Sequence, residues 1–233
     1  MAKAAGISTS MVKATARERL LGNYGTIIAA SIVVDIFYFA SMLFIQRITN
    51  IYISLATEII IDLLFGVFIS GRSYMLMNLA FDQPVTFGDL FFGFKQNPDK
   101  AILIQLIYTI AIIILQIPMF LNTFGLITPI MLLYGTLILL VPYIIFSVAM
   151  SQTFFLLQDF PDNSVRQLVK KSVKIMRNNY LKYIWLVLSF IPMILIGIIT
   201  FFVPLLWVEA YYNASRAMFY KELISQKEKA VNA

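Results

Sequence analysis

The sequence predicts an all-α protein, a polytopic bundle of helices in a membrane. Of its 233 residues, 60% are hydrophobic and 13% are charged, and the mean hydropathy is +0.84. A soluble domain carries about 25% charged residues. The apolar residues also gather in runs of about 20, enough to cross a hydrocarbon core of about 30 Å. We therefore expect one integral membrane domain, residues 1–233, with six transmembrane helices.

Residues 1–24 are polar and basic, and they predict a cytoplasmic amphipathic segment. Residues 10–21 can form a helix that lies in the lipid headgroup layer. One side of this helix collects the apolar residues Met11, Val12, Ala16 and Leu20. A turn at residues 22–25 then leads into the first span, residues 26–44, which holds Asp35 near its middle.

Residues 51–80 predict a central helix around which the other spans are arranged. Its apolar run contains Asp62 and Arg72. Each such charge costs about 2.5–3.5 kcal/mol on insertion into the membrane, and the apolar residues of the run together contribute a favourable insertion free energy of similar size to the cost of the two charges. Because the two sums nearly cancel, we expect this helix to need protein neighbours. Its small residues Gly66, Ser70 and Gly71 would let another helix approach closely.

The middle of the chain predicts an interfacial helix followed by a second hairpin. Thr86 and Asp89 are suited to cap a short amphipathic helix at residues 87–95 that has an aromatic face. The third span covers residues 101–121, and after a turn the fourth covers residues 129–157.

The last third begins with a capping pattern at Ser164 and Gln167, which predicts a basic helix through residue 178. The fifth span covers residues 183–202. A more polar sixth helix starts at Pro204 and contains Glu209 and Arg216, and we expect Arg216 to reach cytoplasmic water. The six-span bundle thus occupies residues 25–222. A charged, frayed cytoplasmic tail is expected at residues 223–233.

The positions of Lys and Arg predict the orientation. Sixteen of the 18 basic residues fall in the N-terminal segment, the loops after the second and fourth spans, and the C-terminal end. Cytoplasmic loops carry an excess of Lys and Arg. Six crossings with both termini in the cytoplasm therefore fit the pattern, and the net charge of +6 needs no nucleic acid to explain it.

Three stretches share one arrangement, which predicts an internal repeat. Each has an amphipathic helix, then an Asn (Asn23, Asn97 or Asn179), then a span. The ends of the first two units also match, at residues 82–84 and 159–161. We expect three parallel repeats, each an interfacial helix plus a two-span hairpin. The alternative is that any cytoplasmic loop before a span collects such residues.

The composition argues against most enzyme chemistry. The chain has no Cys and no His, so zinc sites made from these residues, thiol nucleophiles and His general bases are excluded. The signatures of serine hydrolases, zincins, nucleotide-binding P-loops and dinucleotide-binding folds are absent. We expect no enzymatic activity, no cofactor and no metal.

Ionisable residues within spans are candidates for function. The candidate polar site consists of Asp35, Asp62, Arg72 and Glu209. The alternative is structural ion pairing. Asp62 and Arg72 cannot easily pair, since ten residues separate them by about 15 Å along the helix. We expect Arg72 to find another helix or the cytoplasmic interface, and Asp62 to find hydroxyls, amides or water.

The basic helix is the candidate for contact with anionic lipid headgroups. Its five basic residues lie within twelve positions that contain no acid: Arg166, Lys170, Lys171, Lys174 and Arg177. Each would contribute about 1 kcal/mol near an anionic surface. We expect the apolar residues Val165, Leu168, Val169 and Met176 to face the acyl chains. In the alternative, the helix packs on the floor of the bundle and its charges are solvated.

Short motifs over nearly the whole chain carry a family resemblance. They are Ala16, Arg17 and Leu20 with residues 22–25; Phe91 and Phe94; residues 159–161; Ser172 and Met176; and residues 217–220. On these the chain resembles a family of bacterial integral membrane proteins, common in Gram-positive species and catalogued only as a domain of unknown function. It departs at Arg177, where Gly often follows the Met, and at Ala210, where Pro usually precedes the Tyr. The resemblance implies six spans and no established activity.

Two functions from different classes follow from the sequence. The first is a non-enzymatic accessory or scaffold subunit that acts through helix and lipid contacts, with a possible membrane protein partner. The second is a transporter or channel for a small solute or cation that uses Asp35, Asp62 and Glu209. A third, an enzyme acting on lipids, would require paired carboxylates within reach of one headgroup.

Overall fold

The computed structural model describes residues 7–231, with side chains to residue 227, and all regular structure in this range is helical. The elements in chain order are α1 (Thr9–Leu20), α2 (Tyr24–Ile45), α3 (Ile51–Ala80), the 3₁₀ helix η1 (Phe87–Phe91), α4 (Phe92–Lys95), α5 (Pro98–Thr123), α6 (Pro129–Met150), α7 (Thr153–Asp159), α8 (Val165–Met176), α9 (Tyr180–Leu188), α10 (Ile191–Ile199) and α11 (Leu205–Val231).

Five helical stretches in residues 7–231 are long and apolar enough to cross a membrane. They are Tyr24–Ile45, Ile51–Ala80, Pro98–Thr123, Pro129–Asp159 and Tyr180–Ile199. The helix α11, which carries Glu209, Arg216 and Lys221, is not among them. The prediction of an all-helical protein with several membrane-length helices is therefore confirmed.

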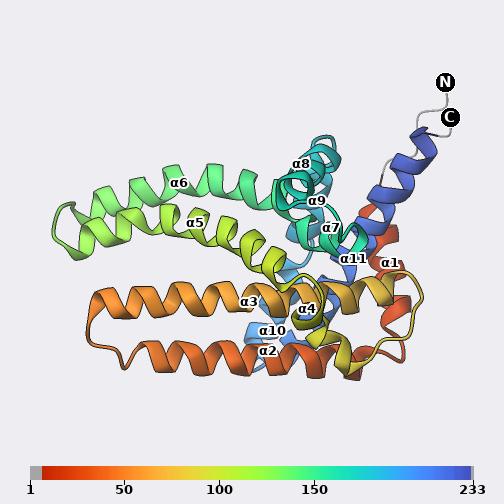
Figure 1. Ribbon diagram of the computed structural model, residues 1–233, viewed down its shortest axis with the longest axis horizontal. Helices are drawn as coiled ribbons and strands as arrows, with labels where there is room; N and C mark the ends of the chain where they lie inside the picture. The colour runs from red at the N-terminus through yellow and green to blue at the C-terminus, as the bar shows by residue number, and fades with distance from the viewer. Residues whose placement is uncertain (1–6, 232–233) are drawn as a thin grey trace.

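The two hairpins α2/α3 and α5/α6 place their turns at the same end of the molecule (Figure 1). The short helices α1, α7 and α8 gather in the other half (Figure 1). This arrangement separates the hairpin turns from most of the basic segments of the chain.

The helix α3 is central, as predicted, since it contacts α1, α2, η1, α4, α5, α7 and α11. Its small residues allow close approach. A Cβ atom added to Gly71 would lie 1.8 Å from the backbone oxygen of Leu90, and one added to Gly66 would lie 2.5 Å from Cβ of Gln105. Glycine at these positions lets η1 and α5 contact α3 at backbone distance.

Both predicted caps are present. At η1 the Thr86 hydroxyl donates to the Asp89 carboxylate at 2.8 Å, and the carboxylate also accepts from the Thr86 backbone N–H at 2.9 Å. At α8 the Ser164 hydroxyl accepts from the Gln167 backbone N–H, and the Gln167 side chain accepts from the Ser164 N–H at 2.9 Å. The residues before each helix therefore fix where the helix begins.

Protein covers most of the apolar face of the helix that was expected at residues 10–21. Val12, Ala16 and Leu20 are buried in the protein, while Met11 is 69% exposed. The helix α1 packs on α11, where the Tyr211 hydroxyl donates to the Lys13 carbonyl at 3.2 Å. An apolar helix face can pack against protein as well as against acyl chains, and the apolar face of α1 packs against protein.

Two further expectations differ from the structure in the last third of the chain. The fifth span is divided at residues 189–190 into α9 and α10. The segment expected to be a frayed tail is helical, because α11 continues to Val231. Lys221, earlier on α11, contacts the end of α3, where its Nζ donates to the Ala80 carbonyl at 2.7 Å.

Candidate functional site

The first polar contact inside the bundle joins Arg72 of α3 to Glu209 of α11. The Arg72 Nη1 atom donates to Glu209 Oε1 at 3.2 Å, and Asn213 Nδ2 donates to the same oxygen at 3.4 Å. Both members of the pair are less than a third exposed. The expectation that Arg72 would find another helix is confirmed, and its partner is a second member of the predicted set.

Asp35 of α2 lies beside this pair. It interacts electrostatically with both Arg72 and Glu209. Ser31, one turn earlier on α2, is buried beside the Glu209 carboxylate. Three of the four predicted site residues therefore form one cluster between α2, α3 and α11.

Asp62 lies apart from that cluster. Its carboxylate accepts hydrogen bonds from the Gln105 side chain at 3.2 Å and from the Thr109 hydroxyl, both on α5. The expected hydroxyl and amide partners are therefore present. Asp62 and Glu58 also line a cavity of about 150 Å³ between α2, α3 and α5. The carboxylates of the predicted site thus belong to two places and not to one.

A larger cavity of about 600 Å³ lies between α3, α5, α6, α9 and α11. Its polar lining includes two arginines and three tyrosines: Arg72, Arg216, Tyr108, Tyr183 and Tyr212. The size lies within the range of about 300–1,000 Å³ that is typical of small-ligand sites. Of these five residues, the sequence prediction had included only Arg72.

Arg216 faces this cavity, so the expectation that it reaches cytoplasmic water is wrong. Its Nε donates to the Tyr183 hydroxyl at 3.1 Å and its Nη2 to the Ser151 carbonyl at 3.3 Å. Its guanidinium also lies 5.7 Å from the centre of the Tyr212 ring. A signal was present in the sequence, because Glu209, Tyr212 and Arg216 recur at a helical spacing that puts them on one side of α11.

The basic face of α8 is accessible. Arg166, Lys170, Lys174 and Arg177 are exposed, and Lys171 lies 3.7 Å above the centre of the Phe160 ring. The expectation that the apolar side faces acyl chains is wrong, because Leu168 and Met176 are buried in the protein and Val165 and Val169 are half-buried. Ser172 between them donates to the Ala149 carbonyl at 2.7 Å.

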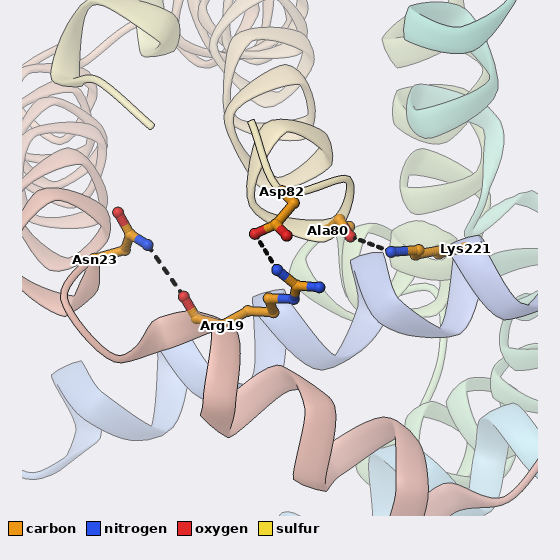
Figure 2. Close-up of polar contacts among 5 residues, drawn as sticks. All are labelled: Arg19, Asn23, Ala80, Asp82 and Lys221. Carbon is orange, nitrogen blue, oxygen red and sulfur yellow. Dashed lines mark hydrogen bonds and ion pairs between the residues drawn. The ribbon is translucent and has the colours of Figure 1, made fainter. Parts of the chain in front are cut away.

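The C-terminal end of α3 is held by α1 and α11 (Figure 2). Arg19 forms an ion pair with Asp82, and Lys221 donates to the Ala80 carbonyl at 2.7 Å. Asp82 has a left-handed backbone with φ of 64°, and the next residue donates its N–H back to the Asn78 carbonyl. This is a Schellman-type helix end. The cations lie where the helix dipole favours positive charge.

Within residues 7–231 no group of three or more His, Cys, Asp or Glu residues is placed to hold a metal ion. The polar chemistry that the described chain does offer consists of carboxylates with hydroxyl, amide or guanidinium partners, and of a cavity with a cationic and phenolic lining.

This architecture defines a multi-helix protein whose apolar helices are of membrane length. The chain belongs to the family described as "Protein of unknown function (DUF975)", which matches residues 7–227. The resemblance to a domain of unknown function is thereby confirmed over almost the whole chain. No curated protein and no solved structure matches the chain.

Proposed function

We propose that the protein is a non-enzymatic, multi-pass protein of the bacterial cytoplasmic membrane, an accessory or scaffold subunit that acts through helix and lipid contacts. One observation carries this proposal. The charged groups in the apolar part of the bundle bond to neighbouring helices: Arg72 to Glu209, and Asp62 to Gln105 and Thr109. Such contacts join helices to one another, which is what a structural role for these charges requires.

The proposed topology has six crossings and cytoplasmic termini, with α11 as the sixth span. An unpaired charge within a bilayer is costly. Pairing of Glu209 with Arg72 lowers that cost for the most polar of the six helices. The common direction of the two hairpin turns, away from the half that holds α1 and α8, also supports this topology (Figure 1).

Three parallel repeats are part of the same proposal. The units would be α1–α3, η1–α7 and α8–α11, each beginning with a short helix. Two of the three repeat asparagines make equivalent contacts. The side chain of Asn23 donates to the Arg19 carbonyl at 3.1 Å, four residues back (Figure 2). The side chain of Asn179 likewise donates to the Ile175 carbonyl at 3.3 Å, four residues back. Asn97 instead takes a left-handed backbone conformation.

The proposed partners are anionic lipid headgroups on the cytoplasmic side and another membrane protein, not nucleic acid. The exposed cations of α8 support the first partner. The outward side of α6 supports the second, because many of its large apolar residues are exposed, among them Ile130, Leu133, Ile138 and Ile145. These apolar side chains can be covered either by lipid or by the apolar helix of another protein.

Isolation from native membrane without detergent exchange tests the proposal. A tagged chain extracted with a membrane-solubilising copolymer should retain anionic lipid and a reproducible set of membrane proteins. Proteins recovered with an unrelated six-span protein of equal expression level provide the control. Recovery of the chain alone, together with intrinsic turnover or ion flux in the purified state, would contradict the proposal.

A second candidate function is transport of a small cation, favoured by Asp62 and Glu58 in the cavity between α2, α3 and α5. Carboxylates in a membrane-embedded cavity are typical of ion pathways. Flux into proteoliposomes that falls on Asp62→Asn, and not on Glu18→Gln at the exposed surface of α1, would favour this function over the first.

A further inference from the structure

We propose that the cavity between α3, α5, α6, α9 and α11 binds a phosphate group, with Arg72 and Arg216 as its ligands. The inference deepens the proposed function, on which it rests, by naming the chemistry of one lipid contact. A phosphate of this kind is carried by a phospholipid headgroup or by a free phosphate compound.

The charge of Arg216 is the first observation. The two ion pairs among the described residues are Arg19–Asp82 and Arg72–Glu209, so Arg216 has no carboxylate partner there. Its partners are a phenol and a backbone carbonyl, both uncharged. A cation within a bundle is costly unless an anion compensates it. An anion in the cavity that Arg216 lines would supply this compensation.

The second observation is that the two guanidinium groups line one cavity and retain donors for a ligand. Each guanidinium carries five N–H donors. Arg72 donates from Nη1, and Arg216 from Nε and Nη2, to protein atoms. No other partner among the described residues accepts from their remaining donors. The two charges are close enough to interact, so they repel each other when the cavity holds no anion. Arginine pairs suit the planar, bidentate recognition of phosphate.

Tyrosine hydroxyls add neutral donors to the same wall. The Tyr183 hydroxyl accepts from Arg216, which leaves its own proton available to donate. Tyr212 lies beside both Tyr183 and Arg216. The hydroxyl proton of Tyr108 is not available to a ligand, since it is donated to the Met150 carbonyl at 2.7 Å. Since Tyr212 and Tyr183 also bond to each other, a phosphate group in the cavity would meet two guanidinium groups and one free phenolic proton.

The remaining lining is apolar, which favours an amphiphile as the carrier of the phosphate. Ile112, Ile184 and Val187 form part of the wall. Ile144 of α6 and Leu188 of α9 also line it, and these two are 43% and 46% exposed on the outside of the bundle. The cavity thus reaches the outer apolar surface between α6 and α9. A headgroup could lie at the arginines while an acyl chain leaves past these residues.

Binding to the full chain in uncharged detergent micelles tests the inference. The probes are phosphatidylglycerol, phosphatidylcholine, glycerol phosphate and inorganic phosphate, each titrated and counted as bound copies by native mass spectrometry. We expect one saturable copy of a phosphate compound. Arg216→Gln should weaken its affinity by about tenfold or more, because a hydrogen bond to a charged group contributes about 1.5–3 kcal/mol.

Lys174→Gln is the matched control, since it removes one positive charge from the exposed face of α8 and leaves the cavity unchanged. It should alter the saturable affinity by less than about twofold, within the range of a surface substitution. Ser147→Phe, which fills the cavity and keeps both arginines, should abolish binding. This second variant decides the matter if Arg216→Gln does not fold, as judged by elution volume and helical circular dichroism.

The probes distinguish the two sources. Binding of the phospholipids alone identifies a headgroup, and equal binding of glycerol phosphate identifies a free phosphate compound. Either result supports the inference when both variants lose it. Absence of saturable binding, or binding unchanged in both variants, would overturn it. If anionic lipid and partner proteins are nevertheless retained from native membrane, the proposed function stands and only this inference fails.

Discussion

Arg72 and Glu209 are 137 residues apart in the chain and join α3 to α11 through a contact of 3.2 Å between Nη1 and Oε1. The pair links the central helix to the last one, and both side chains are less than a third exposed. Since a partly buried charge left without its partner is unfavourable, the pair should hold α3 and α11 in a fixed arrangement.

We expect Glu209→Gln to destabilise the fold by about 1.5–3 kcal/mol, the usual contribution of a hydrogen bond to a charged group. The double variant Arg72→Met with Glu209→Gln should recover part of the loss, because the Arg72 charge is then no longer left without its Glu209 partner. Thermal unfolding in detergent micelles measures the stability of the single and the double variant. Glu18→Gln, at an exposed position of α1, is the control. Equal stability of the single variant and the control would show that the contact contributes nothing.

Much of the fold could be predicted because its signals are local. Capping residues such as Thr86 and Ser164 lie three residues from their partners, and each hairpin is a pair of apolar runs around a polar turn. The polar neighbours of Asp62 were also predictable in kind, since a carboxylate in an apolar run must find donors. Their identity was not, because Gln105 and Thr109 belong to another hairpin.

The sequence-based predictions that differ from the structure share one physical cause. An amphipathic pattern shows that Leu168 and Ala16 avoid water but does not show whether lipid or protein covers them, and here protein does. The cavity was missed for a related reason. It is lined by helices from distant parts of the chain, and only the three-dimensional arrangement brings Tyr108, Tyr183 and Arg216 to one wall. An arginine near a helix end was therefore interpreted as reaching water.

Gly71→Ala should be among the most damaging small substitutions. The added Cβ would meet the backbone oxygen and carbon of Leu90 at 1.8 and 2.6 Å, and backbone cannot rotate away as a side chain can. We expect a loss of about 1–3 kcal/mol, as for other overpacked sites. Gly25→Ala on α2 meets nothing within 4 Å and is the matched control. Similar unfolding temperatures for the two variants would contradict the close approach of η1.

Thr109→Val tests the anchoring of Asp62. The substitution keeps the shape and removes the hydroxyl that donates to the carboxylate. We expect a loss of about 1–3 kcal/mol, because the partly buried carboxylate loses a hydrogen-bond donor. Thr123→Val is matched, because that hydroxyl donates only to the carbonyl four residues back and is exposed. Unfolding in micelles should separate the two variants, and a larger effect at Thr123 would refute the role of the contact.

Cysteine labelling tests the proposed orientation, and the native chain has no Cys to interfere. Single cysteines at Thr49 and Thr123, near the two hairpin turns, should react in intact cells with a membrane-impermeant thiol reagent. A cysteine at Ser164, just before α8, should react only after the cells are opened. Labelling of Ser164→Cys in intact cells would overturn the topology, because it would put the basic helix outside.

The basic face of α8 should lie on an anionic membrane surface through its charges alone, since its apolar side is covered by protein. A polarity-sensitive dye on a cysteine at the exposed Asn178, next to the end of α8, can report this in the full chain. In lipid nanodiscs that contain phosphatidylglycerol we expect a blue-shifted emission compared with discs of neutral lipid.

The shift should disappear in 1 M salt, where the Debye length falls from about 10 Å at 0.1 M to about 3 Å. It should also disappear when Arg166, Lys170, Lys174 and Arg177 are all replaced by Gln, because each contributes about 1 kcal/mol near an anionic surface. Neutralising Lys95 and Lys100 in the α4–α5 region is the control for loss of charge elsewhere. Equal emission in neutral and anionic discs would leave these four side chains as topology signals that contact no lipid headgroup.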